Sequence, residues 1–193
     1  MESDGLLGLG PKTTRRGDDS GEEMHLLVSE LHKDRVIDQA VFAIYLADDR
    51  RKSFAHFGGY DKKIVEESIK ELQSRGIDTS DAEEGIYWVD INSDLHWQVR
   101  LSDAAIGDVR IRRSASDLIF DTGSSLCYMP SSDFRQFISE IRKNTNCAEH
   151  SDGLMYCDCD AQDDARFPTL AFKVGGRVAH WFYLKGRDYL LFS

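Results

Sequence analysis

The stretch SDLIFDTGSSLCYMP, residues 116–130, decides how this sequence is interpreted. Its apolar run Leu118–Phe120 is typical of a strand from a protein interior, and it ends abruptly at Asp121. Gly123 allows a tight turn directly after the strand, because a side chain at that position could clash. Backbone N–H groups in such a turn can point at the carboxylate. The sequence therefore predicts that Asp121 is held stiffly at the end of a strand.

The residues around this glycine, Thr122 and Ser124, add hydroxyl groups that can bond the Asp121 carboxylate or a partner loop. One carboxylate alone activates water poorly, whereas two carboxylates held close together cannot both ionise and share a proton. The ionised member then acts as general base on a water molecule, and the protonated member acts as general acid. Asp-Thr-Gly-Ser is also common turn chemistry, so the motif gains its meaning from the rest of the chain.

The composition is that of an acidic globular chain. Its 193 residues suit one domain or one lobe of a larger protein, and 41% of them are hydrophobic. The formal net charge of −10 argues against nucleic acid and anionic membranes as partners, because a phosphate backbone requires a basic surface. No apolar run approaches the roughly 20 residues that span a bilayer. The sequence begins almost directly with an apolar, glycine-rich motif and ends on an apolar run, so we expect the chain to be part of a longer protein.

Four cysteines are present, and all except Cys127 cluster in one stretch, at Cys147, Cys157 and Cys159. A disulfide from Cys147 to either Cys157 or Cys159 would close a loop of about ten residues and would indicate an oxidising compartment. Free structural thiols are an alternative. A zinc site is another, although zinc usually takes four ligands from paired motifs and only His150 lies nearby.

The hydrophobic pattern predicts a mainly β chain with two or three helices on its outside. Helical spacing of apolar residues occurs in three segments, 22–37, 60–77 and 130–144. β-branched and aromatic runs bounded by turn residues predict strands over 40–47, 54–59, 85–92, 95–111, 169–176 and 178–184. In the third helix, an apolar face is formed by Phe134, Phe137, Ile138 and Ile141.

Several motifs resemble those of the pepsin-like aspartic proteases and occur in the order of that family. They are DGLLGLG at 4–10, the Gly-Gly-Tyr-Asp turn at 58–61, IYWVDINSDLHWQVRL at 86–101, LIFDTGSSLCYMP at 118–130 and FPTLAFKVGG at 167–176. The first is similar to the motif that backs the first catalytic loop in the N-terminal lobe. The second is similar to the end of the interlobe hairpin, and the fourth to the second catalytic loop. The resemblance covers most of the chain.

The resemblance implies a mainly β, pepsin-like aspartic protease lobe with a few peripheral helices. It also implies an aspartic endopeptidase, which hydrolyses a polypeptide substrate with two aspartates and without a cofactor or metal. Asp121 would be the second catalytic aspartate, Thr122 the hydroxyl that links the two catalytic loops, and Gly123 the turn glycine. Ser124 replaces the family's usual threonine and keeps its hydroxyl.

The resemblance also implies where the two lobes meet in the chain and which cysteines form a disulfide. Residues 1–61 would hold the end of the N-terminal lobe and the interlobe hairpin, and 62–193 a C-terminal lobe that is incomplete at its end. The disulfide of that lobe would join Cys147 to Cys157 or Cys159, although the Cys-x-Cys doublet departs from the family pattern.

Three features of the family are absent from this sequence: a first Asp-Thr-Gly loop, the flap tyrosine and the Ile-Leu-Gly-Asp strand. We therefore expect the partner of Asp121 to come from the missing N-terminal lobe of the same parent protein, and the isolated chain to be inactive. A non-catalytic pepsin-like binding protein is the alternative, and a homodimer that pairs two copies of Asp121 is a further one. The resemblance and the cysteines indicate the secretory pathway, a vacuole- or lysosome-like compartment, or the extracellular space.

Overall fold

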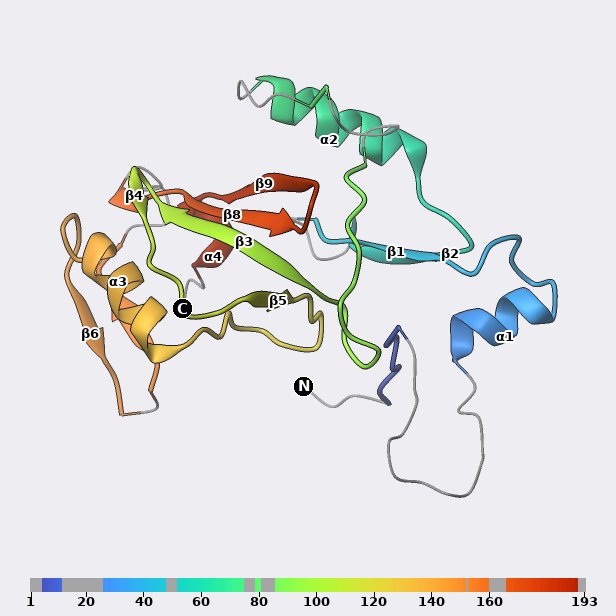
Figure 1. The fold of residues 1–193 in the computed structure, drawn as a ribbon, viewed down its shortest axis with the longest axis horizontal. Coiled ribbons are helices and arrows are strands. Elements are labelled where there is room, and N and C mark those ends of the chain that lie inside the picture. The colour runs from blue at the N-terminus through green and yellow to red at the C-terminus, as the bar shows by residue number, and fades with distance from the viewer. Residues whose placement is uncertain are drawn as a thin grey trace. The chain divides into compact units, whose positions relative to one another are not determined.

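The computed structural model describes residues 5–11, 26–47, 52–74, 79–80, 86–151, 153–159 and 166–190. The chain forms two compact units: the first holds Met1–Trp88 and Asp94–His96, and the second Val89–Ser93 and Trp97–Ser193. Helices α1 and α2 and the hairpin β1–β2 belong to the first unit (Figure 1). No helix of the described residues is long and apolar enough to span a bilayer. The lobe boundary at residue 61 stays a prediction.

The first unit contains two helices and a two-stranded antiparallel hairpin. Its elements are α1 (Leu27–Lys33), β1 (Phe42–Tyr45), β2 (Phe54–Phe57) and α2 (Lys62–Ser74). The predicted hairpin is confirmed, and a helix forms in each of the two predicted segments. The helix predicted to reach residue 37 ends at Lys33, and residues 34–37 form turns and bends; 22–25 and 75–77 of the predicted helices lie outside the described residues. Gly58 follows β2 with φ +85°, and a Cβ there would lie 2.9 Å from the Cβ of Ile37, so this turn requires glycine.

The second unit is organised around the long strand β3, Gln98–Ile106, which lies in an antiparallel sheet. The strands pair in the order β4-β3-β8-β9, and β5 pairs with the start of β3 (Figure 1). The partner strands are β4 (Val109–Arg110), β5 (Asp117–Ile119), β8 (Leu170–Gly175) and β9 (Ala179–Leu184). The predicted mainly β fold class is confirmed.

The strand predicted over residues 85–92 is wrong as a continuous strand. Within the described residues 86–92, Ile91 forms one antiparallel bridge with Val99, and the Asn92 N–H donates to the Gln98 carbonyl at 2.9 Å. From Leu101 onwards β3 pairs with β8, which leaves only the start of β3 for this segment. A competing long-range pairing therefore overrides the local β propensity.

A β-bulge in β3 keeps the buried side chains of the strand on one face. Val99 and Leu101 are buried before the register shift between Leu101 and Asp103, and Ala104 and Ile106 are buried after it. Odd and even positions of a regular strand face opposite sides of the sheet. The extra residue switches this alternation, so both halves of β3 bury the same face.

Ser102 is the extra residue of the bulge, and its polar groups are satisfied by other segments. Its hydroxyl donates to the carbonyl of Gly175. Its carbonyl accepts Nε and Nη2 of Arg113 at 3.2 and 2.8 Å, and Nη1 of the same arginine donates to the Ala115 carbonyl at 2.8 Å. Arg113 therefore joins the bulge to the chain that leads into β5.

The hydrophobic core of the second unit is formed by the end of β3, by β8 and by helix α3, Ser131–Ile141. Its buried members are Ile106, Ile138, Ile141, Phe167 and Leu170. Phe134 and Phe137 are partly buried against this cluster, so the apolar face predicted for the helix is confirmed. Full burial of one such side chain stabilises the fold by about 1.5–3 kcal/mol.

A short disulfide-linked hairpin and a one-turn helix complete the second unit. The elements are β6 (Cys147–Glu149), β7 (Met155–Cys157) and α4 (Gly186–Tyr189). Cys147 stands opposite Cys157 in the hairpin and forms a disulfide with it. Cys127 is an exposed free cysteine, and Cys159 is a partly buried one. Of the two pairings predicted for Cys147, the structure contains the one with Cys157.

Asp133 ties α3 to the segment that precedes β5. Its side chain is 6% exposed, and its carboxylate accepts the backbone N–H groups of Ser114 at 2.8 and 2.9 Å and of Ala115 at 3.2 Å. The hydroxyls of Ser114 and Ser132 donate to it at 2.8 and 3.0 Å. Burial raises the pKa of this carboxyl, but the hydrogen bonds outweigh burial, so its pKa lies below the ordinary value of 3.8.

Asp133→Asn is expected to lower the free energy of unfolding by about 2 kcal/mol near neutral pH, because the amide loses the charge that the surrounding donors stabilise. A lowered pKa means that the ionised carboxylate stabilises the fold above the ordinary pKa and that this stabilisation is lost as pH falls through the lowered value. The difference between wild type and variant should therefore be constant above about pH 5 and shrink below about pH 4. Urea unfolding followed by circular dichroism at several pH values measures it.

Asp108→Asn is the matched control, because it removes the same charge from an exposed residue in the turn between β3 and β4. Its effect on unfolding should be small. If both variants unfolded at the same urea concentration near neutral pH, the role assigned to Asp133 would be wrong.

Candidate active site

Strand β5 carries the candidate catalytic loop on the edge of β3. Leu118 stands opposite Val99, and Ile119 opposite Gln98. One residue further, the Phe120 N–H donates to the Trp97 carbonyl at 3.0 Å. Backbone pairing therefore continues up to the residue before Asp121, and the sheet determines where the loop begins.

The loop after β5 holds the Asp121 carboxylate with its own atoms. The Gly123 N–H donates to Oδ1 at 2.8 Å, and the Ser124 hydroxyl donates to Oδ2 at 2.7 Å. The Ser124 N–H also donates to the Asp121 carbonyl at 3.3 Å. Each carboxylate oxygen thus receives a hydrogen bond from the same turn, which restricts the rotation of the side chain.

Gly123 is required at its position because the Asp121 carboxylate approaches it closely. A Cβ built on this glycine would lie 3.1 Å from Oδ1 of Asp121. Such a contact is tight, so a side chain here would push the carboxylate away from the N–H that bonds it. The reason for glycine is therefore the close approach of the carboxylate.

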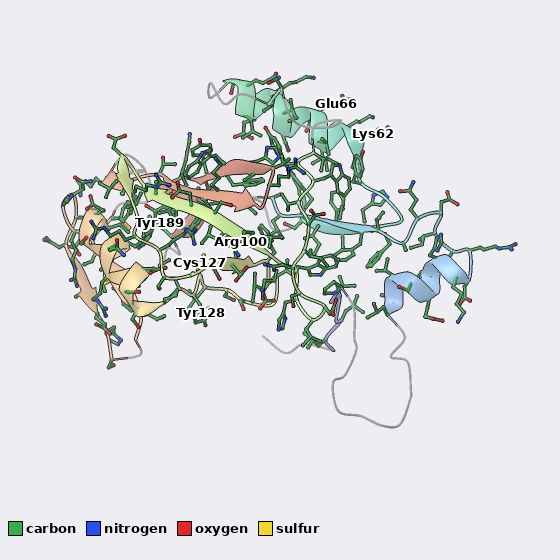
Figure 2. All side chains as sticks on the ribbon, in the orientation of Figure 1. Lys62, Glu66, Arg100, Cys127, Tyr128 and Tyr189 are labelled. Carbon is green, nitrogen blue, oxygen red and sulfur yellow. A yellow bond between two sulfur atoms is a disulfide. The ribbon has the colours of Figure 1, made fainter. Side chains whose placement is uncertain are left out.

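The loop is exposed to solvent, and exposed apolar residues flank it in the sequence. Residues 121–125 are all exposed. Ile119 and Phe120 before the loop are 51% and 56% exposed, and Tyr128 after it is 82% exposed (Figure 2). Within the described part of the chain, the exposed Thr122 hydroxyl makes no hydrogen bond. The loop that carries the carboxylate is therefore exposed, and exposed apolar residues precede and follow it along the chain.

The carboxylate of Asp117, at the start of β5, binds side chains that lie outside this strand. Asn92 Nδ2 donates to its Oδ1 at 2.5 Å, and the Ser116 hydroxyl donates to its Oδ2 at 2.5 Å. The bond from Ser116, and then that from Asn92, lowers the pKa of this carboxyl against the smaller effect of desolvation, and the charges of Arg100 and Arg113 lower it further. Neither the contact nor its role is recognisable from the sequence, because Asn92 and Asp117 are 25 residues apart.

The structure brings together only some of the residues that were singled out in the sequence. Asp121, Gly123 and Ser124 form one bonded loop, whereas the disulfide candidates lie on the separate hairpin β6–β7. Among the described residues, no group of three or more His, Cys, Asp and Glu side chains could hold a metal ion. The chemistry that this loop can supply is that of one positioned carboxylate, which can accept a proton from water or donate one.

Comparison with known proteins reveals similarity to pepsin A, gastricsin and vacuolar protease A. The chain is 27% identical to pepsin A of Gallus gallus over 97% of its own length and 42% of that protein. It is 28% identical to gastricsin of Rattus norvegicus, covering 72% of the chain and 31% of that protein. It is 27% identical to vacuolar protease A of Aspergillus fumigatus, covering 97% of the chain and 40% of that protein. The chain thus spans at most about two fifths of the length of these relatives.

The family model described as eukaryotic aspartyl protease matches residues 1–191, which is nearly the whole chain. This match includes the Asp-Thr-Gly loop and the sheet that carries it. The chain therefore belongs to the eukaryotic aspartyl protease family, whose pepsin-like members it resembles.

Proposed function

We propose that this chain supplies one of the two catalytic aspartates of an aspartic endopeptidase, and that this aspartate is Asp121. The observation that carries the proposal is the geometry of its loop. The carboxylate stands at the exposed end of β5 and accepts hydrogen bonds from Gly123 and Ser124. Such a carboxylate is oriented before substrate arrives, as a general acid or base must be.

The proposed reaction is the hydrolysis of a peptide bond in an extended polypeptide. A second aspartate would approach the exposed side of Asp121, and the two carboxylates would share one proton because both cannot ionise at close range. The ionised member takes a proton from the attacking water, and the protonated member donates one to the carbonyl oxygen. No cofactor takes part in this scheme. A dyad that must keep one proton suits acidic pH.

We propose that the second aspartate lies in an N-terminal lobe of the same parent protein. The chain contains one Asp-Thr-Gly triplet, at residues 121–123, and it spans at most about two fifths of the relatives to which it is similar. The exposed Thr122 hydroxyl is available to bond the loop that brings the second aspartate. The uncovered Ile119, Phe120 and Tyr128 provide apolar surface for the same contact.

The proposed location of the parent protein is the secretory pathway or a vacuole-like compartment. The Cys147–Cys157 disulfide supports an oxidising environment during folding. One similar protein carries the name vacuolar protease A. An acidic lumen would also match the pH at which a shared proton is retained.

The 193-residue chain alone is expected to show no acid peptidase activity, because a single carboxylate cannot supply both the base and the acid. Incubation of the purified chain with denatured haemoglobin between about pH 3 and pH 6, followed by gel electrophoresis, measures this. Added pepstatin identifies any trace of a contaminating aspartic protease. Cleavage that depends on Asp121 in the isolated chain would contradict the need for a second lobe.

In the complete parent protein, Asp121→Asn is expected to reduce kcat by at least about 10²–10⁴-fold, because an amide can neither take nor give the proton. Asp108→Asn is the control for the loss of one surface charge and should retain activity. Circular dichroism of both variants establishes that they are folded. Substantial activity in folded Asp121→Asn would remove Asp121 from the mechanism.

Ser124→Ala is expected to lower kcat/KM of the complete protein roughly tenfold, because the hydrogen bond to Oδ2 of Asp121 is made to a charged group. Ser124→Thr keeps the hydroxyl and should retain most of the activity. Ser125→Ala is the loop control, since Ser125 makes no hydrogen bond to Asp121 within the described residues. Equal losses in Ser124→Ala and Ser125→Ala would show that the effect is general to the loop.

A further inference from the structure

We propose that Cys147, Cys157 and Cys159 form a thiol–disulfide exchange site in which Cys147 pairs with either Cys157 or Cys159. The structure contains the pair Cys147–Cys157, and Cys159 is the nearest cysteine along the chain. This proposal is independent of the proposed peptidase function, because it concerns the hairpin β6–β7 and needs no catalytic aspartate.

The three sulfur-bearing side chains share one environment. Cys159 lies two residues beyond Cys157, the last residue of β7, and residues two apart on an extended chain point to the same face. All three cysteines are partly buried, and each packs against the same core cluster, which is Ile106, Ile138, Ile141, Phe167 and Leu170. The free thiol of Cys159 therefore lies on the same side of the hairpin as the disulfide.

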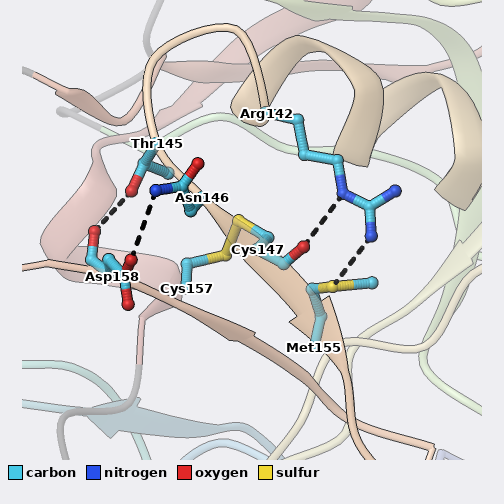
Figure 3. The surroundings of a disulfide bond; sticks show 7 residues. All are labelled: Arg142, Thr145, Asn146, Cys147, Met155, Cys157 and Asp158. Carbon is cyan, nitrogen blue, oxygen red and sulfur yellow. Dashed lines mark hydrogen bonds between the residues drawn. A yellow bond between two sulfur atoms is a disulfide. The ribbon is translucent and has the colours of Figure 1, made fainter.

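Cys147 is the fixed member of the three. Figure 3 shows Arg142, from the turn after α3, reaching across to β6 and β7. Its Nε donates to the Cys147 carbonyl at 3.2 Å, and its Nη2 lies 3.8 Å from the sulfur of Met155. The bond to the carbonyl holds the backbone of Cys147 beside the end of the helix, and it does not involve the strand that carries Cys157.

The hydrogen bonds of Asp158, the residue between Cys157 and Cys159, hold the observed pairing (Figure 3). Its backbone N–H donates to the Asn146 carbonyl at 2.8 Å. Its carbonyl accepts the Thr145 hydroxyl, and its carboxylate accepts Asn146 Nδ2 at 3.5 Å. Strand β7 itself ends at Cys157, so these bonds are what keeps the next two residues in register.

A shift of the β7 segment by two residues replaces one pairing with the other. Side chains alternate with a period of two, so this shift brings Cys159 opposite Cys147 without turning any side chain to the other face. Diagonal neighbours across a hairpin are about 7–8 Å apart, and a disulfide requires Cβ atoms within about 4 Å. The move is therefore a few ångströms. It requires the bonds of Asp158, the present β6–β7 pairing and the turn bonds of His150 to open and the hairpin to pair again in the shifted register.

The exchange itself needs no oxidant or reductant. The thiol of Cys159 loses its proton to solvent, and the thiolate attacks the sulfur of Cys147. The new Cys147–Cys159 bond forms as the Cys147–Cys157 bond breaks. Cys157 leaves as a thiolate and takes a proton from solvent, so the number of disulfides and of thiols stays the same.

The test maps the disulfides of the folded, oxidised chain after equilibration in a glutathione redox buffer and blocking of free thiols with N-ethylmaleimide. A Cys127→Ser background prevents exchange through the exposed thiol. Cleavage before aspartate residues separates the other three cysteines, because aspartates lie between them in the sequence. Mass spectrometry then distinguishes the Cys147–Cys157 link from the Cys147–Cys159 link. We expect both links, with Cys147–Cys157 in excess.

Thr145→Val removes the hydroxyl that bonds the Asp158 carbonyl. It should raise the ratio of the Cys147–Cys159 link to the Cys147–Cys157 link roughly fivefold, the effect of losing one ordinary hydrogen bond. Thr169→Val is the matched control, because Thr169 is an exposed threonine outside the hairpin. It should leave the ratio unchanged.

Cys157→Ala should drive Cys147 to pair with Cys159 in the same buffer. A folded Cys157→Ala chain in which both thiols stay unlinked overturns the proposal. So does a Cys147–Cys159 link that appears only after denaturation in guanidinium. If Cys157→Ala does not fold, the folded wild type and Thr145→Val provide the test. A measurable Cys147–Cys159 link whose share rises in Thr145→Val supports the exchange. Absence of this link from both proteins overturns it.

Discussion

The bulge at Ser102 is the constraint on which the second unit depends. If these residues formed a regular strand without a bulge, Ala104 and Ile106 would face the side of the sheet opposite to Val99 and Leu101. One half of β3 would then lose its buried face. The bulge allows the start of β3 to hold β5 while its end places Ile106 in the core with α3. The position of the candidate catalytic loop and the packing of the core thus both depend on one irregularity in one strand.

Three charged side chains connect the chain before β5 to the rest of the second unit. Arg113 donates to the carbonyl of the bulge, and Asp133, on α3, accepts the backbone N–H groups of two residues before β5. Asp117 accepts the side-chain amide of Asn92. Arg113 and Asp133 satisfy backbone groups of a segment that has little regular pairing of its own, whereas Asp117 bonds side chains. They determine where β5 lies, whereas Gly123 and Ser124 determine how the Asp121 carboxylate is oriented. Position and orientation of the candidate catalytic group therefore have separate causes.

The sequence predicted those features that depend on neighbouring residues. The apolar face of α3, the hairpin β1–β2 and a turn after Phe120 all follow from patterns a few residues long. Features that join distant segments were not predictable. Nothing local marks Ser102 as a bulge, because its role arises from pairing with β8.

The choice of disulfide partner and the conformation of residues 85–92 also depend on distant segments, so the sequence did not predict them. Cys157 and Cys159 lie on the same face of an extended chain, so spacing could not choose between them as partners of Cys147. Cys157 stands opposite Cys147 in the register of β6 and β7, and the hydrogen bonds of Asp158 accompany this register; both arise only in the folded hairpin. Residues 86–92 have strong β propensity, but β8 occupies most of the edge of β3 that they would need.

The two ends of α3 are held by restraints that respond differently to acid. At its start, the clamp of Asp133 depends on an ionised carboxylate, and the hydrogen bonds that lower its pKa keep that clamp intact at more acidic pH than an ordinary aspartate would allow. At its end, Arg142 and the Cys147–Cys157 hairpin supply a permanently charged group and a covalent bond, which do not titrate in acid. A dyad that shares a proton requires acidic surroundings, which protonate ordinary carboxylates. Carboxylates with lowered pKa values, arginine and disulfides keep their contacts in such surroundings, and the second unit combines all three around α3.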